Sequence, residues 1–233
     1  MSRTKALFFD LYNTLARFWP PTEEIQVAAC QALGLQVTPK GIIRGYALAD
    51  AYFSQENATR PLAERTAQER GRFFAEYERL ILQGTGVEVS TELASQVWQQ
   101  VSQVPKELAL FEDVLPALRR LKERGLTLGL LSNVRWELGE LGHRLGLDAY
   151  LDFTVTSQEA GAEKPHPPIF LLALERAGVG AGEAMHVGDQ YQSDVLGARA
   201  VGIIPVLVDR ANLHPHRNDC IKIRSLAELE AHL

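Results

Sequence analysis

Hydrophobic positions along the chain change their spacing near residue 110. Between residues 22 and 104, apolar residues recur every three or four positions, and no convincing strand run occurs. This is the spacing of helices that bury one face. It predicts four helices, which cover residues 22–33, 42–54, 63–82 and 90–101. Together they form a helical block of small-domain size.

Shorter apolar runs occur at the N-terminus and again after residue 113. Residues 6–9 form the first predicted strand, and the others are 126–131, 153–156, 184–187, 203–208 and 221–223. Helical patterns separate or follow them at 114–123, capped by Asp113, and at 136–145, 167–177, 195–201 and 226–232. Alternating strands and helices imply a parallel sheet with helices on both faces. Pro205 interrupts one predicted strand, which suggests an edge strand or a bulge.

These patterns predict an α/β fold built from two domains. Residues 1–15 and 106–233 form the sheet-containing core, and residues 16–105 form a helical cap inserted after the first strand. We expect the cap to cover the carboxyl edge of the sheet, where ligands of open parallel sheets bind. The active site is then expected in the crevice between the two domains, where a lid excludes water.

The composition is that of an ordinary globular protein, with 46% hydrophobic and 23% charged residues in 233. A net charge of -5 indicates no basic surface for nucleic acid, and no apolar run approaches membrane-spanning length. Residues 6–9 are too few for a signal peptide. Cys30 and Cys220 show no metal-ligand spacing and are expected to be reduced thiols. We expect a cytoplasmic protein without nucleic-acid or membrane partners, whose oligomeric state stays open.

Polar groups stand at four places after the predicted strands. They are Asp10 with Thr14, Ser132 with Asn133, Lys164 after a loop, and Gly188-Asp189 with Asp194. Because the carboxyl ends of parallel strands meet at one edge of a sheet, these side chains are expected to lie together. Each group alone also suits a structural role, as a cap, a turn or a solvated loop. Their occurrence at successive strand ends favours a functional site.

The residue types at this edge indicate a specific chemistry. A carboxylate such as Asp10 can attack an electrophile and form a covalent intermediate. Asp10 and Asp189 would share a divalent cation, and Mg²⁺ with its water ligands suits carboxylate oxygens. Thr14, Ser132 and Lys164 would bind an oxyanion, with Lys164 as a compact positive charge.

Four segments of the chain resemble the motifs of the haloacid dehalogenase superfamily of hydrolases. They are FFDLYNTL, LLSNV, EKPHPPIF and HVGDQYQSDVLGAR, and the resemblance covers nearly the whole chain. It implies a Rossmann-like core with a helical cap inserted after the first motif, and Asp10 as the nucleophile. It further implies that Thr14 and Ser132 contact the transferring group and that Lys164 balances the charge around that group. Asn133, which follows Ser132, is counted among these catalytic residues. The implied Mg²⁺ ligands are Asp10, the backbone carbonyl of Tyr12 and Asp189, supported by Asp194.

The motifs leave two branches of this superfamily open, the phosphatases and the 2-haloacid dehalogenases. Its phosphatases carry an acid–base aspartate two residues after the nucleophile, where this chain has Tyr12. Tyrosine at that position is typical of the 2-haloacid dehalogenases, which need no metal. Those enzymes replace the Gly-Asp of the fourth motif, which is kept here as Gly188-Asp189, and they keep a tyrosine where this chain has Phe170. They also use a cap arginine, for which Arg44 is the nearest candidate, although a solvated helix residue is the simpler interpretation.

The balance favours Mg²⁺-dependent hydrolysis of a small phosphate ester through an aspartyl-phosphate intermediate, with altered acid catalysis at Tyr12. The first alternative is a 2-haloacid dehalogenase that acts through an aspartyl ester. The second is a non-catalytic binding protein that keeps the metal site. The substrate is expected to be a small molecule chosen by cap residues, which follow no readable motif. Arg60, Arg65 and His143 are candidates for such contacts.

Overall fold

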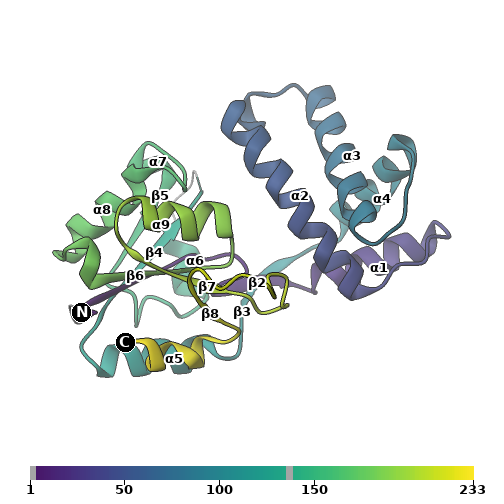
Figure 1. Ribbon diagram of the computed structural model, residues 1–233. Coiled ribbons are helices and arrows are strands. Elements are labelled where there is room, and N and C mark those ends of the chain that lie inside the picture. The colour runs from purple at the N-terminus through teal and green to yellow at the C-terminus, as the bar shows by residue number, and fades with distance from the viewer. Residues whose placement is uncertain (1–3, 135–138) are drawn as a thin grey trace. The chain divides into compact units, whose positions relative to one another are not determined.

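The computed structural model of the chain describes residues 4–134 and 139–233. The chain divides into two compact units (Figure 1). One combines Met1–Arg17 with Leu108–Leu233, and the other is Phe18–Glu107. Each unit is described by itself below. No helix among the described residues is both long and apolar enough to cross a membrane.

The first unit contains a six-stranded parallel sheet. Its strand order is β5-β4-β1-β6-β7-β8, which places the first strand of the chain in the middle of the sheet. The strands are β1 (Ala6–Phe9), β4 (Thr127–Ser132), β5 (Phe153–Thr156), β6 (Ala184–Gly188), β7 (Ile204–Val208) and β8 (Ile221–Ile223). The predicted α/β, Rossmann-like fold class is confirmed.

Helices cover both faces of this sheet because β1 is apolar on both sides. Leu7 and Phe9 join a cluster with residues of α5 (Val114–Glu123), whereas Ala6 and Phe8 join a second cluster with residues of α8 (Pro167–Ala177). Alternate residues of a strand point to opposite faces, so one short strand anchors both halves of the core. In Figure 1, α5 and α8 lie on opposite sides of the sheet. The remaining helices are α6 (Gly139–Arg144), α7 (Ser157–Ala160), α9 (Gly197–Ala200), a π-helix (Tyr191–Leu196) and 3-10 helices at Ala181–Glu183 and Leu226–His232.

Two predictions about this unit differ from the structure, and a third lies partly outside the described residues. The edge position suggested by Pro205 is wrong, because β7 lies between β6 and β8. The proline is tolerated because pairing with β8 begins only at Val206, so no ladder bond from the proline nitrogen is required on that side. The helix predicted at 195–201 begins earlier, as the π-helix from Tyr191. Residues 136–138 of the helix predicted at 136–145 lie outside the described residues, and α6 covers Gly139–Arg144.

The second unit consists of helices. These are α1 (Thr22–Ala32), α2 (Pro39–Thr59), a short 3-10 helix (Leu62–Glu64), α3 (Ala67–Gly84) and α4 (Thr91–Gln103). Helix α2 is longer than predicted at both ends, since Thr38 caps it by accepting a hydrogen bond from the Gly41 amide at 3.1 Å. Helices α2 and α3 approach closely at two glycines, where a Cβ on Gly84 would lie 2.3 Å from the Gly45 Cα.

Two short strands were not predicted. Strands β2 (Ala16–Trp19) and β3 (Glu107–Leu110) pair as a separate two-stranded sheet. They occupy the two segments through which the chain passes from one unit to the other. Each has only four residues, and their sequences, ARFW and ELAL, show no extended apolar run. No strand of the described chain falls between residues 22 and 104.

Candidate active site

Asp10 follows the last residue of β1 and stands at the carboxyl end of the sheet. Its backbone amide donates to the carbonyl of Val187 at 2.9 Å, which continues the pairing of β1 with β6 by one residue. The side chain is 13% exposed, and its Oδ1 accepts a hydrogen bond from the Lys164 Nζ at 2.6 Å. The predicted nucleophile is therefore fixed at the sheet edge and paired with the predicted lysine.

Lys164 is almost completely buried between two carboxylates. Besides Asp10, the Lys164 Nζ donates to Asp194 Oδ1 at 2.7 Å. The side chains of Lys164 and Asp194 are each 2% exposed. Its backbone is held by Asn133, whose Oδ1 accepts from the Lys164 amide at 2.7 Å and whose Nδ2 donates to the Lys164 carbonyl at 3.0 Å. Asn133, predicted among the catalytic residues, thus lies where it positions the lysine. Burial lowers the pKa of Lys164, but the two carboxylates outweigh it and raise the pKa above its ordinary value.

Asp194 lies in the π-helix and is held by three partners. Its Oδ1 also contacts the Nε2 of His186 at 3.0 Å, and its Oδ2 accepts from the backbone amide of Gln190 at 2.9 Å. Burial alone would raise the pKa of Asp194, but Lys164 and His186 lower it below the ordinary range. Asp194 is therefore a fixed anion and does more than cap the following helix.

His186 is a site residue that the sequence reasoning did not single out. It is completely buried in β6, and its ring packs edge-on against Phe170 with centroids 5.1 Å apart. Burial lowers its pKa, which favours the neutral imidazole. The available signal was a polar residue in the middle of the otherwise apolar run AMHVG. Only the structure shows that it faces Asp194.

Close packing explains the glycine of the fourth motif. A Cβ on Gly188 would lie 2.2 Å from the Cγ of Asp194, so any side chain there would displace the carboxylate. Gly197 is similar, since its Cβ would lie 2.7 Å from the Phe170 ring and 2.9 Å from the Pro165 Cα. Both glycines let the π-helix approach the strand and loop that carry the lysine and the acids.

The residues after Asp10 form a tight turn, which we call the Asp10 loop and define as Leu11–Ala16. The Leu15 and Ala16 amides both donate to the Leu11 carbonyl, at 2.9 and 2.8 Å, and Asn13 adopts a left-handed conformation with φ of 57°. Asparagine tolerates this conformation better than most residues. The side chain of Thr14 is completely buried, and its Oγ1 has no hydrogen-bond partner among the described residues.

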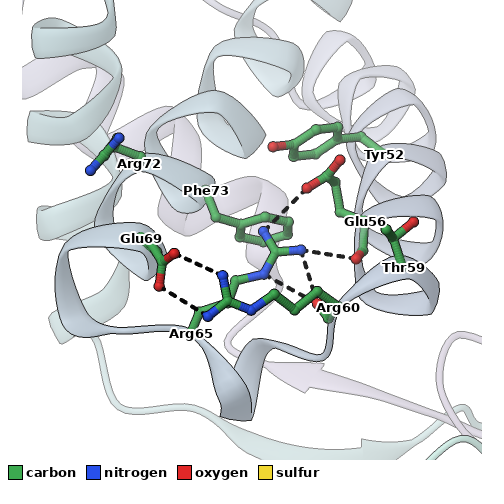
Figure 2. Close-up of a pocket in the computed structure, with 8 residues that line it drawn as sticks. All are labelled: Tyr52, Glu56, Thr59, Arg60, Arg65, Glu69, Arg72 and Phe73. Atoms are coloured by element: carbon green, nitrogen blue, oxygen red, sulfur yellow. Dashed lines mark hydrogen bonds and ion pairs between the residues drawn. The ribbon is translucent and has the colours of Figure 1, made fainter.

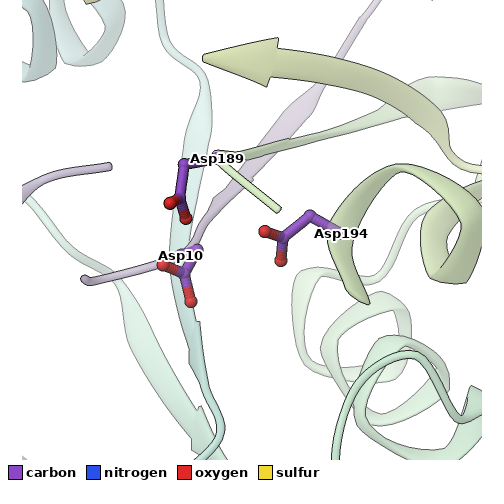
Figure 3. A group of neighbouring side chains, drawn as sticks. All are labelled: Asp10, Asp189 and Asp194. Atoms are coloured by element: carbon purple, nitrogen blue, oxygen red, sulfur yellow. The ribbon is translucent and has the colours of Figure 1, made fainter. Parts of the chain in front are cut away.

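Three acids converge at this edge of the sheet. Asp10, Asp189 and Asp194 each offer a carboxylate oxygen, and these three atoms lie within 4.8 Å of one another (Figure 3). Burial raises the pKa of Asp10 to about 6, and the charge of Asp194 adds to the rise while Lys164 opposes it. Lys164 pairs with two of the three carboxylates, those of Asp10 and Asp194. Such a cluster offers the carboxylate oxygens that a divalent cation takes as ligands.

Comparison with known proteins identifies the family to which this chain belongs. The family model for haloacid dehalogenase-like hydrolases matches residues 4–202, which include all four motifs. The chain belongs to this family of hydrolases. A ribulose-1,5-bisphosphate 5-phosphatase from Halopiger xanaduensis is 31% identical over 218 residues, which cover 88% of this chain and 84% of that protein. A glyceraldehyde 3-phosphate phosphatase from Methanopyrus kandleri is 30% identical over 223 residues, with 92% and 89% coverage.

The other branch of the family is also represented among solved structures. A 2-haloacid dehalogenase from Pseudomonas syringae pv. Tomato is 25% identical, with a TM-score of 0.55 and coverage of 98% of this chain and 97% of that one. Where that branch keeps a tyrosine, this haloacid dehalogenase-like hydrolase has Phe170, which is fully buried against His186 and offers no hydroxyl. Tyr12, the residue that favours the dehalogenase branch, pairs through its backbone with Ala16 in the Asp10 loop.

Ser132 completes the edge on the other side of β1. It is the last residue of β4, which pairs with β1, and it is 5% exposed. The structure joins five of the predicted site residues by hydrogen bonds or in one acidic cluster: Asp10, Lys164, Asp189, Asp194 and Asn133. The other three, Tyr12, Thr14 and Ser132, lie at a strand end or in the Asp10 loop. Arg44 is exposed on α2, and His143 is exposed and paired with Asp148 at 3.2 Å.

A pocket of about 320 Å³ in the helical unit is lined partly by Arg60 and Arg65 (Figure 2). The Arg65 guanidinium donates to the Glu56 side chain at 3.2 Å and carbonyl at 2.9 Å, and it lies 5.1 Å from the centre of the Phe73 ring. Arg60 pairs with Glu69 at 2.8 Å. Because these donors are used within the unit, the two arginines fasten the corner between α2 and α3, and we assign them no substrate contact.

Proposed function

We propose that this hydrolase is a Mg²⁺-dependent phosphatase that acts on a small phosphate ester through Asp10. The observation that carries the proposal is the acidic cluster of Asp10, Asp189 and Asp194, which brings three carboxylate oxygens within 4.8 Å of one another. The phosphatase relatives support the same reaction, since both are at least 30% identical over most of their length.

The chain's own residues account for the two chemical steps. Lys164 engages Oδ1 of Asp10, which leaves the second oxygen to attack phosphorus. The phosphorus–oxygen bond to the leaving alcohol breaks, and that oxygen takes up a proton from solvent water. Water then attacks the aspartyl phosphate, which releases inorganic phosphate and restores the Asp10 carboxylate. Thr14 and Ser132 would donate to the phosphoryl oxygens, a role that suits the buried Thr14 Oγ1, which has no partner in the described part of the chain.

Asp10, Asp189 and Asp194, with the carbonyl of Tyr12, would hold the Mg²⁺ ion. When bound, the ion would neutralise charge on the phosphoryl group and orient it for attack. Asp194 would bind the ion while it also fixes Lys164. This double role explains why Asp194 is itself held by His186 and the Gln190 amide. The helical unit, residues 16–105 in our proposal, would act as the cap that selects the substrate.

A 2-haloacid dehalogenase is the second candidate, and Tyr12 is the observation that favours it. In that reaction Asp10 would displace halide from carbon, and water would hydrolyse the resulting ester. Phe170 and the intact acidic cluster count against it. We therefore rank it below the phosphatase.

One experiment separates the two reactions. Purified protein is assayed for phosphate release from aryl and alkyl phosphates and for halide release from 2-haloacids, each with Mg²⁺ and with chelator. We expect phosphate release that needs Mg²⁺, its loss in Asp10→Asn, and normal activity in Asp148→Asn, which changes an exposed acid of the same unit. Chelator-resistant halide release would instead establish the dehalogenase.

A further inference from the structure

Asp113 occupies the N-cap position of α5, as predicted, but its side chain makes no capping hydrogen bond. Its Oδ2 instead accepts from the Ser225 hydroxyl at 2.7 Å, the Leu226 amide at 2.8 Å and Arg210 Nη1 at 2.9 Å. Burial alone would raise its pKa, but these donors outweigh burial and lower it. Asp113 is therefore a fixed anchor for an arginine on a distant part of the chain.

Arg210 follows β7 and is held on two sides. Its Nη1 and Nη2 bind the two oxygens of Asp113 at 2.9 and 3.0 Å, a bidentate geometry, and both side chains are less than one-fifth exposed. The guanidinium carbon lies 4.0 Å from the centre of the Phe111 ring. Paired carboxylate and aromatic contacts of this kind hold a guanidinium in one orientation.

The remaining contact of Arg210 reaches the Asp10 loop. Its Nη2 donates to the backbone carbonyl of Thr14 at 2.9 Å, although the two residues are 196 positions apart in the chain. The next carbonyl, that of Leu15, accepts from the Phe111 amide at 3.1 Å. The loop is thus tied at two consecutive carbonyls to the residues that hold the arginine. Because Asp113 neutralises the guanidinium, Arg210 offers orientation rather than free positive charge.

We propose that Arg210 is a positioning residue for the reaction: by binding the Thr14 carbonyl, it fixes the Asp10 loop, which follows directly after Asp10 and contains Thr14. The inference rests on the proposed function for its kinetic consequence only. A loop that is free to shift would misplace the attacking carboxylate and the Thr14 hydroxyl, and misplacement by about 1 Å lowers rates on the order of 10²-fold. Substrate binding in the ground state would change much less.

The kinetic test compares Arg210→Ala with Arg120→Ala. Arg120 is the matched control, because it also pairs with one carboxylate, Glu230 at 3.0 Å, on the same unit but far from the Asp10 loop in sequence. We expect Arg210→Ala to lower kcat on the order of 10²-fold with KM within about threefold of wild type. Millimolar guanidinium should restore part of kcat, and urea at the same concentration should not. Arg210→Lys should retain an intermediate kcat.

The second measurement does not depend on turnover. Hydrogen exchange of peptides that contain Leu11–Ala16 should accelerate in Arg210→Ala and not in Arg120→Ala, with melting temperatures recorded for both. Unchanged exchange in the loop, or a loss of kcat that neither guanidinium nor lysine relieves, would overturn the role of Arg210. If wild type hydrolyses neither substrate class, the proposed function fails, and the exchange result alone then decides the positioning role.

Discussion

Replacing Asp10 with asparagine should stabilise the metal-free protein. Burial raises the pKa of Asp10 from 3.8 to about 6, even though Lys164 lies 2.6 Å from its Oδ1. A carboxyl group whose pKa is higher in the folded chain than in the unfolded chain weakens folding once it is ionised. The rise corresponds to roughly 3 kcal/mol. Because the side chain is only 13% exposed, solvent screening removes little of it.

The sign of the effect fixes its pH dependence. Below the unfolded value of 3.8, Asp10 is protonated in both states and makes no unfavourable contribution. As pH rises from 3.8 to about 6, the unfolded chain ionises first and the unfavourable contribution grows, and above about 6 it is complete. Asparagine carries no charge at any of these pH values. The variant should therefore match wild type below about pH 3 and exceed its unfolding free energy by roughly 3 kcal/mol at about pH 8.

The assay is urea unfolding followed by circular dichroism, in chelator, across this pH range. Asp148→Asn serves as the control, since it makes the same change at an acid that is 55% exposed. Mg²⁺ should then stabilise wild type by mass action and narrow the gap. If Asp10→Asn is no more stable than wild type at high pH, the carboxylate does not carry the desolvation that the geometry assigns to it.

Three further predictions concern the acids and Tyr12. Asp189→Ala removes one of the three clustered carboxylates, so the rise in Tm with added Mg²⁺, measured by differential scanning fluorimetry, should be largely lost; an unchanged Mg²⁺ response would contradict the metal site. Tyr12→Asp should raise alkyl phosphate hydrolysis by up to about 10²–10⁴-fold relative to aryl phosphates, because it supplies a better proton donor, while Mg²⁺ affinity stays unchanged. Equal selectivity in wild type and variant would remove that account of Tyr12. Glu78→Gln should stabilise the protein by up to roughly 3 kcal/mol near about pH 8 and little near about pH 5. Burial raises the pKa of this completely buried acid to about 7, although the hydrogen bond from Gln26 at 2.8 Å lowers it. An unfolding free energy equal to that of wild type at both pH values would refute this prediction.

The strands and helices of the sheet-containing unit were largely predictable because their burial follows the sequence closely. Strand β5 (Phe153–Thr156), helix α8 (Pro167–Ala177) and strand β8 (Ile221–Ile223) have the predicted bounds. Pro205 misled because local propensity does not say how far a neighbouring strand extends, and β8 stops short of it. Strands β2 and β3 were not predicted for a related reason, since each short strand is formed by pairing with a segment distant in sequence.

The candidate site was predictable to the extent that strand ends determine it. Parallel strands bring Asp10 and Asp189 to one edge, and the structure places their oxygens with that of Asp194 within 4.8 Å. The sequence could not assign Asn133 to the Lys164 backbone, or His186 to Asp194, because these contacts depend on side-chain orientation across different elements. Arg210 shows the same limit at greater distance, since nothing in its local sequence points to a carbonyl 196 positions away.

The charge balance of the site bears directly on the choice between phosphatase and dehalogenase. A phosphate ester and a 2-haloacid are both anions, and both must approach the cluster of Asp10, Asp189 and Asp194, in which Lys164 pairs with two of the three carboxylates. Burial is the main cause that raises the pKa of Asp10 to about 6, and a protonated carboxyl cannot attack. Binding of an anionic substrate beside carboxylates and ionisation of the buried nucleophile therefore both carry an electrostatic cost. A divalent cation would remove both obstacles at once, whereas Tyr12 in place of an acid adds no further negative charge. The proposal of a metal-dependent phosphatase follows from these two costs, and it predicts that Mg²⁺ tightens inorganic phosphate binding in wild type and does so much less in Asp189→Ala.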